Sequence, residues 1–252
     1  MEDRFSRKGQ AVSRLALLGF IFAALAGFTA VLSGFGTRWD WWHFRTGFSI
    51  LRWTAYGGIA AAVISFTGTI LTRPGTLRRG FVLSLSGLFI ALFTFGVPLC
   101  WWWTARHVPP IHDITTDLEN PPGFVSVLPL RKDAPNPVEY GGTEIAEKQK
   151  EAYPDIVPII LPLSPPQAFE RAYRTALKMG WEIIDRNPRE GRIEATDTTF
   201  FFGFKDDIVV RITPSGQGSR IDVRSVSRVG KSDVGTNAKR IEKYLKALAE
   251  KE

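Results

Sequence analysis

The stretch RIEATDTTFFFGFKDDIVVRITPSGQGSRIDVRSVSRV, residues 192–229, indicates three β-strands joined by two turns. Apolar side chains recur at every second position from Ile208 to Ile212, so they point to one side of a strand. Asp207, Val209 and Arg211 occupy the alternate positions and point to the other side. Turns are indicated by residues 203–206 (GFKD) and 215–218 (SGQG). The pattern predicts an antiparallel sheet with one apolar face and one open, charged face.

Two helices are predicted on either side of these strands. Residues 164–180 (SPPQAFERAYRTALKMG) begin with a capping box formed by Ser164 and Gln167 and end at a glycine. A further strand, WEIID, follows directly, and a second amphipathic helix begins at about residue 236. We therefore expect residues 156–252 to form an α+β domain made of a helix, a four-stranded antiparallel meander and a helix.

The preceding segment, residues 111–155, has a different composition. It is rich in Pro, Gly, Asp and Asn, as in PPGF and RKDAPNPVEYGG. These residues favour turns and extended backbone over helix. We expect an extended segment, and whether it packs on the domain stays open at this point.

Three long runs near the N-terminus carry no charged residue, namely residues 15–37, 53–72 and 80–105. A helix that crosses the hydrocarbon layer needs about 20 mainly apolar residues, so each run is long enough. The first is too long for the apolar part of a cleavable signal peptide, which has about 7–15 residues. No ionisable group interrupts the runs, whereas a transport pathway usually contains one. Residues 1–110 are therefore predicted to be a membrane anchor with three transmembrane helices.

The net charge of +7 belongs to this anchor. Residues 1–111 hold 11 Lys and Arg against 3 acidic residues, and residues 112–252 hold 21 against 22. A nucleic-acid-binding domain would carry its own basic excess, so we expect no nucleic-acid partner.

The flanking charges predict the orientation of the helices. Seven basic residues lie on the side of the N-terminus, and four lie on the opposite side. The positive-inside rule then places the N-terminus in the cytoplasm and the C-terminal domain outside. In this topology seven of the eight tryptophans fall at the outer membrane surface, where indole rings are favoured: Trp39, Trp41, Trp42, Trp53, Trp101, Trp102 and Trp103.

One stretch has the composition of an anion site. Residues 222–241 (DVRSVSRVGKSDVGTNAKRI) hold two glycines and lead into the last helix, and the candidate ligands are Arg224, Arg228, Lys231 and Arg240. Unpaired N–H groups at a helix start and forked guanidinium donors suit phosphate or carboxylate. The alternative is ion pairing within the fold, with Arg224 bound to Asp222 or Asp207 and with Asp233 or Thr236 capping the helix. On the anion hypothesis Arg228 is the residue that contacts the ligand.

No catalytic residue, metal ligand or cofactor site is predicted. The outer region has a single histidine, His112, and the only cysteine, Cys100, lies in the third apolar run. The carboxylates near Asp113 and Asp117 lack the ligand spacing of a calcium loop. Asp206 and Asp207 are adjacent on a strand, so they point to opposite faces and cannot work as a pair.

The outer region resembles the bacterial family called domain of unknown function 1499. Four pieces carry the resemblance: IHDITTDLENPPGF, the pattern AF…A…GW where a helix leads into a strand, GRIEATDTTFFFGFKDDIVVRI and SRIDVRSVSRVGKSDVGTNAKRI. The resemblance covers about residues 111–252. As the resemblance implies, members of this family are bacterial proteins of unknown function, often attached to a membrane, and no activity or catalytic residue can be carried over from them. For this chain we expect the cytoplasmic (inner) membrane.

Two functions are consistent with these features. The first is a membrane-tethered extracytoplasmic binding or interaction module that recognises an anionic envelope component or a lipid headgroup. The alternative is an envelope hydrolase that acts on an anionic substrate. We favour the first, because no nucleophile–base pair or metal cluster can be assembled from the residues present. The oligomeric state stays open.

Overall fold

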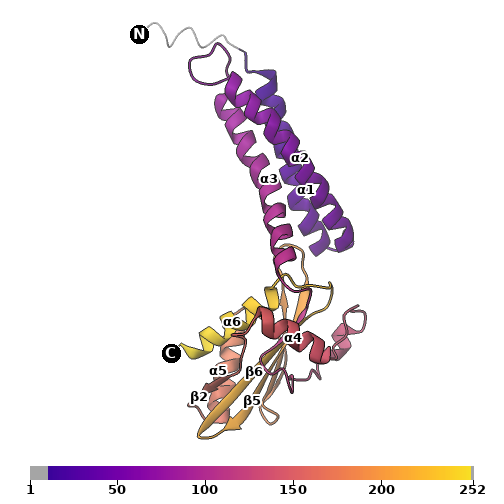
Figure 1. The fold of residues 1–252 in the computed structure, drawn as a ribbon, viewed down its shortest axis with the longest axis vertical. Helices are drawn as coiled ribbons and strands as arrows, with labels where there is room; N and C mark the ends of the chain where they lie inside the picture. The colour runs from indigo at the N-terminus through magenta and orange to yellow at the C-terminus, as the bar shows by residue number, and fades with distance from the viewer. Residues whose placement is uncertain (1–10, 251–252) are drawn as a thin grey trace. The chain divides into compact units, whose positions relative to one another are not determined.

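The computed structural model describes residues 11–250 and divides into two compact units (Figure 1). The chain up to Trp103, together with Phe201–Gly203, forms the helical unit. The rest of the chain, from Thr104 onward, forms the α+β unit.

The helical unit consists of α1 (Arg14–Arg38), α2 (Phe44–Leu71) and α3 (Phe81–His107). Each helix is long and apolar enough to cross a membrane. The second helix begins well before residue 53, where its charge-free run starts. A charged residue interrupts an apolar run but does not end a helix. The helix α2 therefore extends on its N-terminal side through Arg45 and Arg52 to its cap. The side chain of His43 makes that cap by accepting a hydrogen bond from the backbone N–H of Arg45.

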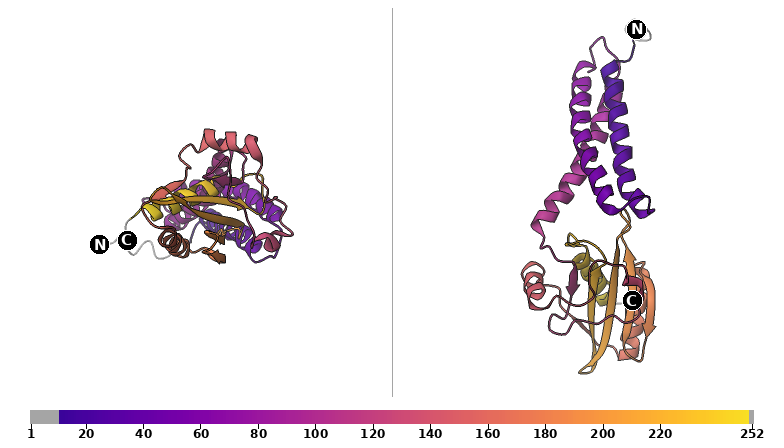
Figure 2. Two further views of the ribbon diagram at one scale, coloured as in Figure 1. Left: turned by 90° about the horizontal axis from the view of Figure 1, so that it is seen from below. Right: turned by 90° about the vertical axis from the view of Figure 1, so that its right-hand side faces the viewer.

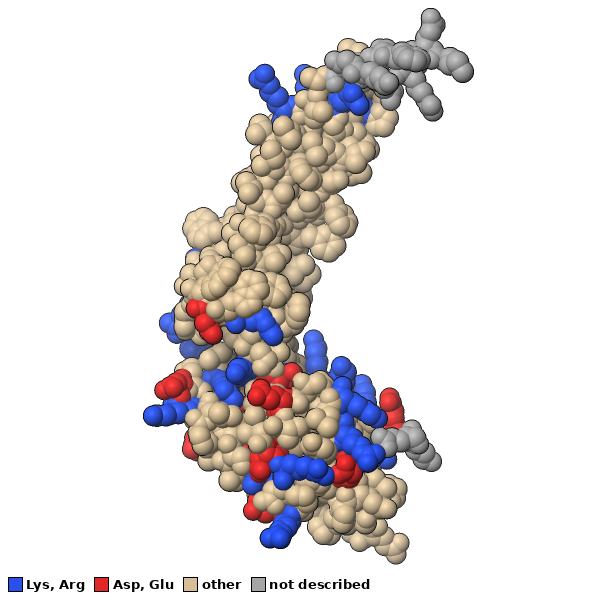
Figure 3. Space-filling view, turned by 180° about the vertical axis from the view of Figure 1, so that it is seen from behind, with Lys and Arg blue, Asp and Glu red and all other residues tan. Residues whose placement is uncertain are grey.

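Small residues fill the inside of the helical unit. Ala23, Ala61 and Ala91 are completely buried and form its core, whereas Phe28 and Val63 are more than 60% exposed. A soluble bundle buries its large apolar side chains, and a bundle in lipid instead packs its helices closely through small ones. On the face shown in Figure 3, uncharged side chains cover this unit between its two ends, where charged side chains lie. This packing is compatible with helices that span a membrane.

The α+β unit is built on one antiparallel sheet (Figures 1 and 2). Its long strands form the meander β3 (Glu182–Asn187), β4 (Arg192–Thr198), β5 (Lys205–Ser215) and β6 (Gly218–Ser227). The sheet has six strands rather than the expected four, because β1 (Asp113–Thr115) and β2 (Ile159–Leu161) both pair with β6. Three-residue strands carry too little alternation to be predicted from sequence.

Helices α5 (Pro165–Lys178) and α6 (Thr236–Ala249) cover the apolar face of the sheet. Ile208, Ile221 and Val223 point into this core as their alternation predicts, and each is at most 1% exposed. The backbone N–H of the α5 cap, Ser164, donates to Gln167 Oε1, so the predicted capping box forms. The core also includes Ile111 and Ile114 from the segment that precedes the predicted domain.

The segment 111–155 is therefore part of the fold and is not only extended. It contains β1, the 3₁₀ helix η3 (Leu128–Arg131) and the helix α4 (Gly142–Ala152). Gln149 of α4 holds β1 in place, because its amide accepts from the backbone N–H of Thr115 and donates to the carbonyl of the same residue. The α+β unit begins at Thr104, close to the end of the predicted anchor at residue 110, and so it includes this segment.

This segment also changes the second face of the sheet, which we expected to be open. Phe124 and Val127 pack against Val209 and Val226 and form a second small core there. Asp207 on the same face has no exposed surface. The charged face is covered by residues 113–140, because its charges pair with groups on that covering segment.

Candidate functional site

Arg224 lies in β6 under the covering segment. Its guanidinium makes two hydrogen bonds to Asp113, of 2.9 and 2.7 Å, and donates to the backbone carbonyl of Val138. The rings of Phe124 and Tyr140 lie with their centroids 5.4 Å from it, close enough for cation–π attraction. Burial raises the pKa of Tyr140 to about 12, and the Asp113 carboxylate adds to this effect. The partner of Arg224 is therefore Asp113 and neither Asp222 nor Asp207.

Arg228 lies at the end of β6 and binds Asp207 with two hydrogen bonds of 2.9 and 2.8 Å. The same carboxylate accepts from Arg131 at 2.6 Å and from the hydroxyl of Thr196 at 2.7 Å. Burial alone would raise the pKa of Asp207, but the hydrogen bonds from Arg228, Thr196 and Arg131 outweigh it, so the pKa is lowered. One buried carboxylate thus holds two arginines.

Arg240 lies on the other side of the sheet, on α6. It donates to Asp206 at 2.6 Å and to Asp197 at 2.7 Å. Asp206 and Asp207 thus serve opposite faces of β5, as adjacent strand residues should. Lys231 is exposed in the turn between β6 and α6.

The four residues of the predicted anion site are consequently not brought together. Arg224 and Arg228 lie under the covering segment, Arg240 lies on the helix-covered face, and Lys231 is on the surface. An external anion would have to displace a carboxylate from each arginine. Anion binding by these four residues stays a prediction, and an anion would have to compete with the carboxylates that pair with the three arginines.

The start of α6 has its own anion. The carboxylate of Asp233 accepts hydrogen bonds from the backbone N–H groups of Gly235 at 2.9 Å and Asn237 at 2.6 Å. These are the amides that would otherwise be free to bind a ligand. Burial raises the pKa of Asp233 in spite of these two hydrogen bonds. The helix start is therefore capped, which is the alternative that the sequence left open.

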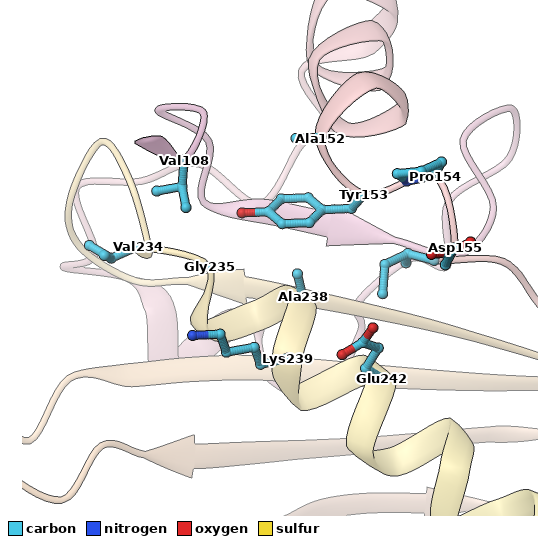
Figure 4. Close-up of a pocket in the computed structure, with 11 residues that line it drawn as sticks. Val108, Ala152, Tyr153, Pro154, Asp155, Val234, Gly235, Ala238, Lys239 and Glu242 are labelled. Atoms are coloured by element: carbon cyan, nitrogen blue, oxygen red, sulfur yellow. The ribbon is translucent and has the colours of Figure 1, made fainter. Parts of the chain in front are cut away.

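A cavity of about 270 Å³ lies beside this turn, within the α+β unit (Figure 4). Its floor is the first part of α6, with Ala238 and Gly235. Its opposite wall is the loop that follows α4, including Tyr153 and Ile156, and Val108 closes one side. The surroundings are mostly apolar with a few polar groups, as is usual for sites that bind small molecules.

The hydroxyl of Tyr153 is the most informative group in this cavity. Its oxygen is buried and makes no hydrogen bond to any residue in the described part of the chain. A Cβ atom at Gly235 would lie 3.3 Å from that oxygen and 3.8 Å from Val108 Cγ1, so the glycine leaves space in front of the hydroxyl. Burial, and then the charge of Asp233, raises the pKa of Tyr153, so the group is a neutral donor and acceptor. An unpaired buried hydroxyl costs about 1–3 kcal/mol.

The backbone at the edge of the cavity is also unusual. Val234 has a φ of 55° and Gly235 a φ of 78°. A β-branched residue at positive φ is a steric outlier that costs on the order of 1–3 kcal/mol. Strained backbone of this kind is found preferentially at binding sites, because the surrounding structure must hold it in place.

The arrangement can hold a ligand but offers little for catalysis. Lys239, Glu242 and Asp155 are the charged groups that line the cavity, and no histidine, cysteine or serine does. Within residues 11–250 no group of three or more metal-ligating side chains is close enough to hold a metal ion. His112 contributes its backbone carbonyl to Ser227 and Asn237.

Sequence reasoning missed this cavity for a physical reason. Its walls come from the chain after α3, the loop after α4 and the start of α6, which lie far apart in sequence. The only local signal is the sequence DVG at residues 233–235, with a capping residue and a glycine next to a helix start. That signal indicates a turn and does not reveal the tyrosine that faces it.

Two comparisons with known proteins bear on identity. A search among curated proteins finds no match to the chain. Residues 113–248 match the family model DUF1499, described as a protein of unknown function. The match covers more than half of the chain and includes both β1 and the cavity-lining part of α6. The protein therefore belongs to the DUF1499 family.

Proposed function

We propose that this protein is a membrane-anchored binding module of the bacterial envelope. In this proposal α1, α2 and α3 cross the cytoplasmic membrane, with the N-terminus in the cytoplasm. The α+β unit then lies outside and binds a small envelope component or a lipid headgroup in the cavity beside α6. The observation that carries the proposal is the buried, unpaired hydroxyl of Tyr153 in that cavity.

The packing of the helices supports insertion. Exposed large apolar side chains are unfavourable in water by about 25 cal/mol for each Å² of apolar surface, and the helical unit exposes many of them. In lipid the same surface carries no such cost, and packing through small residues is the usual arrangement. The charge asymmetry and the seven tryptophans support the proposed direction of insertion.

Alkaline-phosphatase fusions test the orientation. A fusion after residue 110 should be active, because the enzyme folds only outside the cytoplasm, and a fusion near residue 76 should be silent. The reverse pattern would place the α+β unit in the cytoplasm and contradict the proposed location.

The pairing of the buried charges supports ligand binding as the function over catalysis. Arg131, Arg224 and Arg240 are buried and each is bound to a carboxylate, so these charges stabilise the fold. The charged groups that line the cavity are Asp155, Lys239 and Glu242, and none of the three is an activated nucleophile. Reversible recognition needs only complementary surfaces and a few well-placed polar groups.

Native mass spectrometry of the full chain in detergent tests the binding function. The wild type should carry a bound small molecule or lipid, visible as a mass excess. Ala152→Trp, at the exposed last residue of α4 where it lines the cavity, should reduce that excess strongly. Ala249→Trp, at the exposed last residue of α6 outside the cavity, is the matched control and should keep it.

A wild type without any bound molecule would contradict the binding function. So would an equal mass excess in the wild type and Ala152→Trp, because the ligand would then lie elsewhere.

A further inference from the structure

The charged groups of the cavity are arranged by sign. Lys239 and Glu242 lie one turn apart on α6, and Asp155 faces them from the loop after α4. Figure 4 shows the Lys239 ammonium directed toward the Gly235 end, whereas the Glu242 carboxylate and the residue Asp155 lie toward the other end. Within residues 11–250 none of the three forms an ion pair with a neighbouring side chain. The cavity therefore offers a positive end and a negative end.

This arrangement discriminates between classes of ligand. A purely anionic ligand would meet one ammonium and two carboxylates, so repulsion would offset much of its attraction to Lys239. A purely cationic ligand would have the opposite conflict with Lys239. A wholly apolar ligand would leave the Tyr153 hydroxyl buried without a partner. A ligand with both charges offers a partner of opposite sign to each of these exposed charged groups and a hydrogen-bond partner to the buried Tyr153 hydroxyl.

We propose that the cavity binds a zwitterion in which an ammonium group and a phosphate or carboxylate are separated by a short chain. The anionic group lies at Lys239 and accepts a hydrogen bond from the Tyr153 hydroxyl. The ammonium group lies between Glu242 and Asp155. The apolar part of the ligand contacts Val108 and Ile156. This inference rests on the binding function proposed above.

Two sources supply this chemistry, a phosphoethanolamine headgroup on a lipid and a free amino acid or similar small zwitterion. A lipid source is considered because the cavity-lining residue Val108 directly follows His107, the last residue of α3, in the sequence. The volume of about 270 Å³ admits a headgroup or an amino acid and is small for anything larger.

Binding of defined probes to the full-length protein in phosphatidylglycerol nanodiscs, whose lipid headgroup carries no ammonium group, tests the inference. The soluble probes are phosphoethanolamine, leucine, ethanolamine and inorganic phosphate, measured by calorimetry. We expect phosphoethanolamine or leucine to bind about tenfold or more tightly than ethanolamine and phosphate, because each half-molecule loses one charged contact. A second set of nanodiscs that contains phosphatidylethanolamine identifies a lipid source, since the lipid would then compete with the soluble probe.

Matched variants locate the contacts. Lys239→Met and Glu242→Gln should each weaken the zwitterion by about tenfold. Lys243→Met, exposed on α6, and Glu147→Gln, exposed on α4, lie outside the cavity and should leave the affinity unchanged. Tyr153→Phe should weaken binding without unfolding the protein.

The outcomes separate the two proposals. If inorganic phosphate or ethanolamine binds as tightly as the zwitterions, the ligand class is wrong while the cavity remains a binding site. The same holds if native mass spectrometry finds a cavity ligand that lacks one of the two charges. If no probe binds and Ala152→Trp changes nothing, the binding function fails and the inference fails with it.

Discussion

On one face of the sheet, Ile208, Ile221 and Val223 pack against α5 and α6 in an apolar core. On the other face Asp207 and Asp222 are just as deeply buried, and both are bound to arginines. An apolar contact accepts many partners and orientations, whereas a buried ion pair is stable only with its own partner in good geometry. The comparison indicates that the helix-covered face supplies general stability. The charged face fixes where the covering segment, residues 113–140, must lie.

The largest effect is expected when the covering segment is removed from the domain altogether. A fragment of residues 150–252 keeps both helices and the meander but loses the carboxylate of Asp113, the guanidinium of Arg131 and the small core at Phe124. We expect it to show no cooperative thermal transition, while a fragment of residues 104–252 should unfold cooperatively. A cooperative transition of the shorter fragment would show that the covering segment is dispensable.

Single substitutions on the two faces should differ strongly. Asp207→Ala leaves Arg131 and Arg228 without their shared carboxylate and should lower the free energy of unfolding by about 3–5 kcal/mol. Ile221→Val on the apolar face should cost only about 0.5–1.5 kcal/mol. Urea denaturation of the α+β unit measures both.

A triple variant, Arg131→Met with Asp207→Leu and Arg228→Met, tests whether the loss comes from unpaired charges or from any substitution at these positions. Replacing all charged members by apolar side chains should regain much of the loss. If Asp207→Ala costs no more than Ile221→Val, the charged face does not have the role assigned to it.

Sequence patterns predicted the first face well and the second poorly, and the reason is physical. Alternation from Ile208 to Ile212 and the capping box at Ser164 are local signals, so the apolar face and α5 were predicted. The pairing of Asp113 with Arg224 joins residues 111 positions apart and leaves no local pattern. From the sequence we could expect that Arg224 pairs with a carboxylate, but we could not identify which one.

The helix α4 and the cavity illustrate the same limit. Prolines and glycines around residues 135–142 favour turns, and α4 offers the core little more than Ile145 and a buried glutamine. Its position depends on the amide of Gln149 reaching β1, which is a tertiary contact. The cavity in turn exists only once that helix and α6 have been placed.

Acid should act on Asp207 and Asp233 in opposite directions. The pKa of Asp207 is lowered from its ordinary value of 3.8, so its stabilising effect is complete above that value. The effect is lost as the pH falls from about 4 through the folded-state pKa. The pKa of Asp233 is raised, so its ionisation opposes folding as the pH rises through its folded-state value.

Stability measured against pH for two variants checks these signs. Asp207→Asn should be less stable at neutral pH and should lose less of its stability below pH 4. Asp233→Asn keeps an oxygen to cap α6 and should be close to the wild type at neutral pH or more stable. A steeper loss in acid for Asp207→Asn than for the wild type would contradict the assignment.

A smaller effect is expected at the edge of the cavity. Val234→Gly should relieve the positive φ of 55° and raise the stability by up to about 1 kcal/mol. Val157→Gly, at an exposed position without positive φ, should lower it by a few tenths to about 1 kcal/mol. Equal losses at both positions would mean that Val234 is not strained.

The account depends most directly on the Tyr153 hydroxyl, whose removal should separate binding from folding. The measurement is native mass spectrometry of full-length Tyr153→Phe beside the wild type, with the thermal midpoint of each recorded. Removing an unpaired buried hydroxyl should leave the midpoint unchanged or higher, because no hydrogen bond within the described fold is lost. The account predicts a bound molecule in the wild type and a clearly smaller bound fraction in Tyr153→Phe. Equal occupancy in both proteins, or a wild type without any bound molecule, would contradict it.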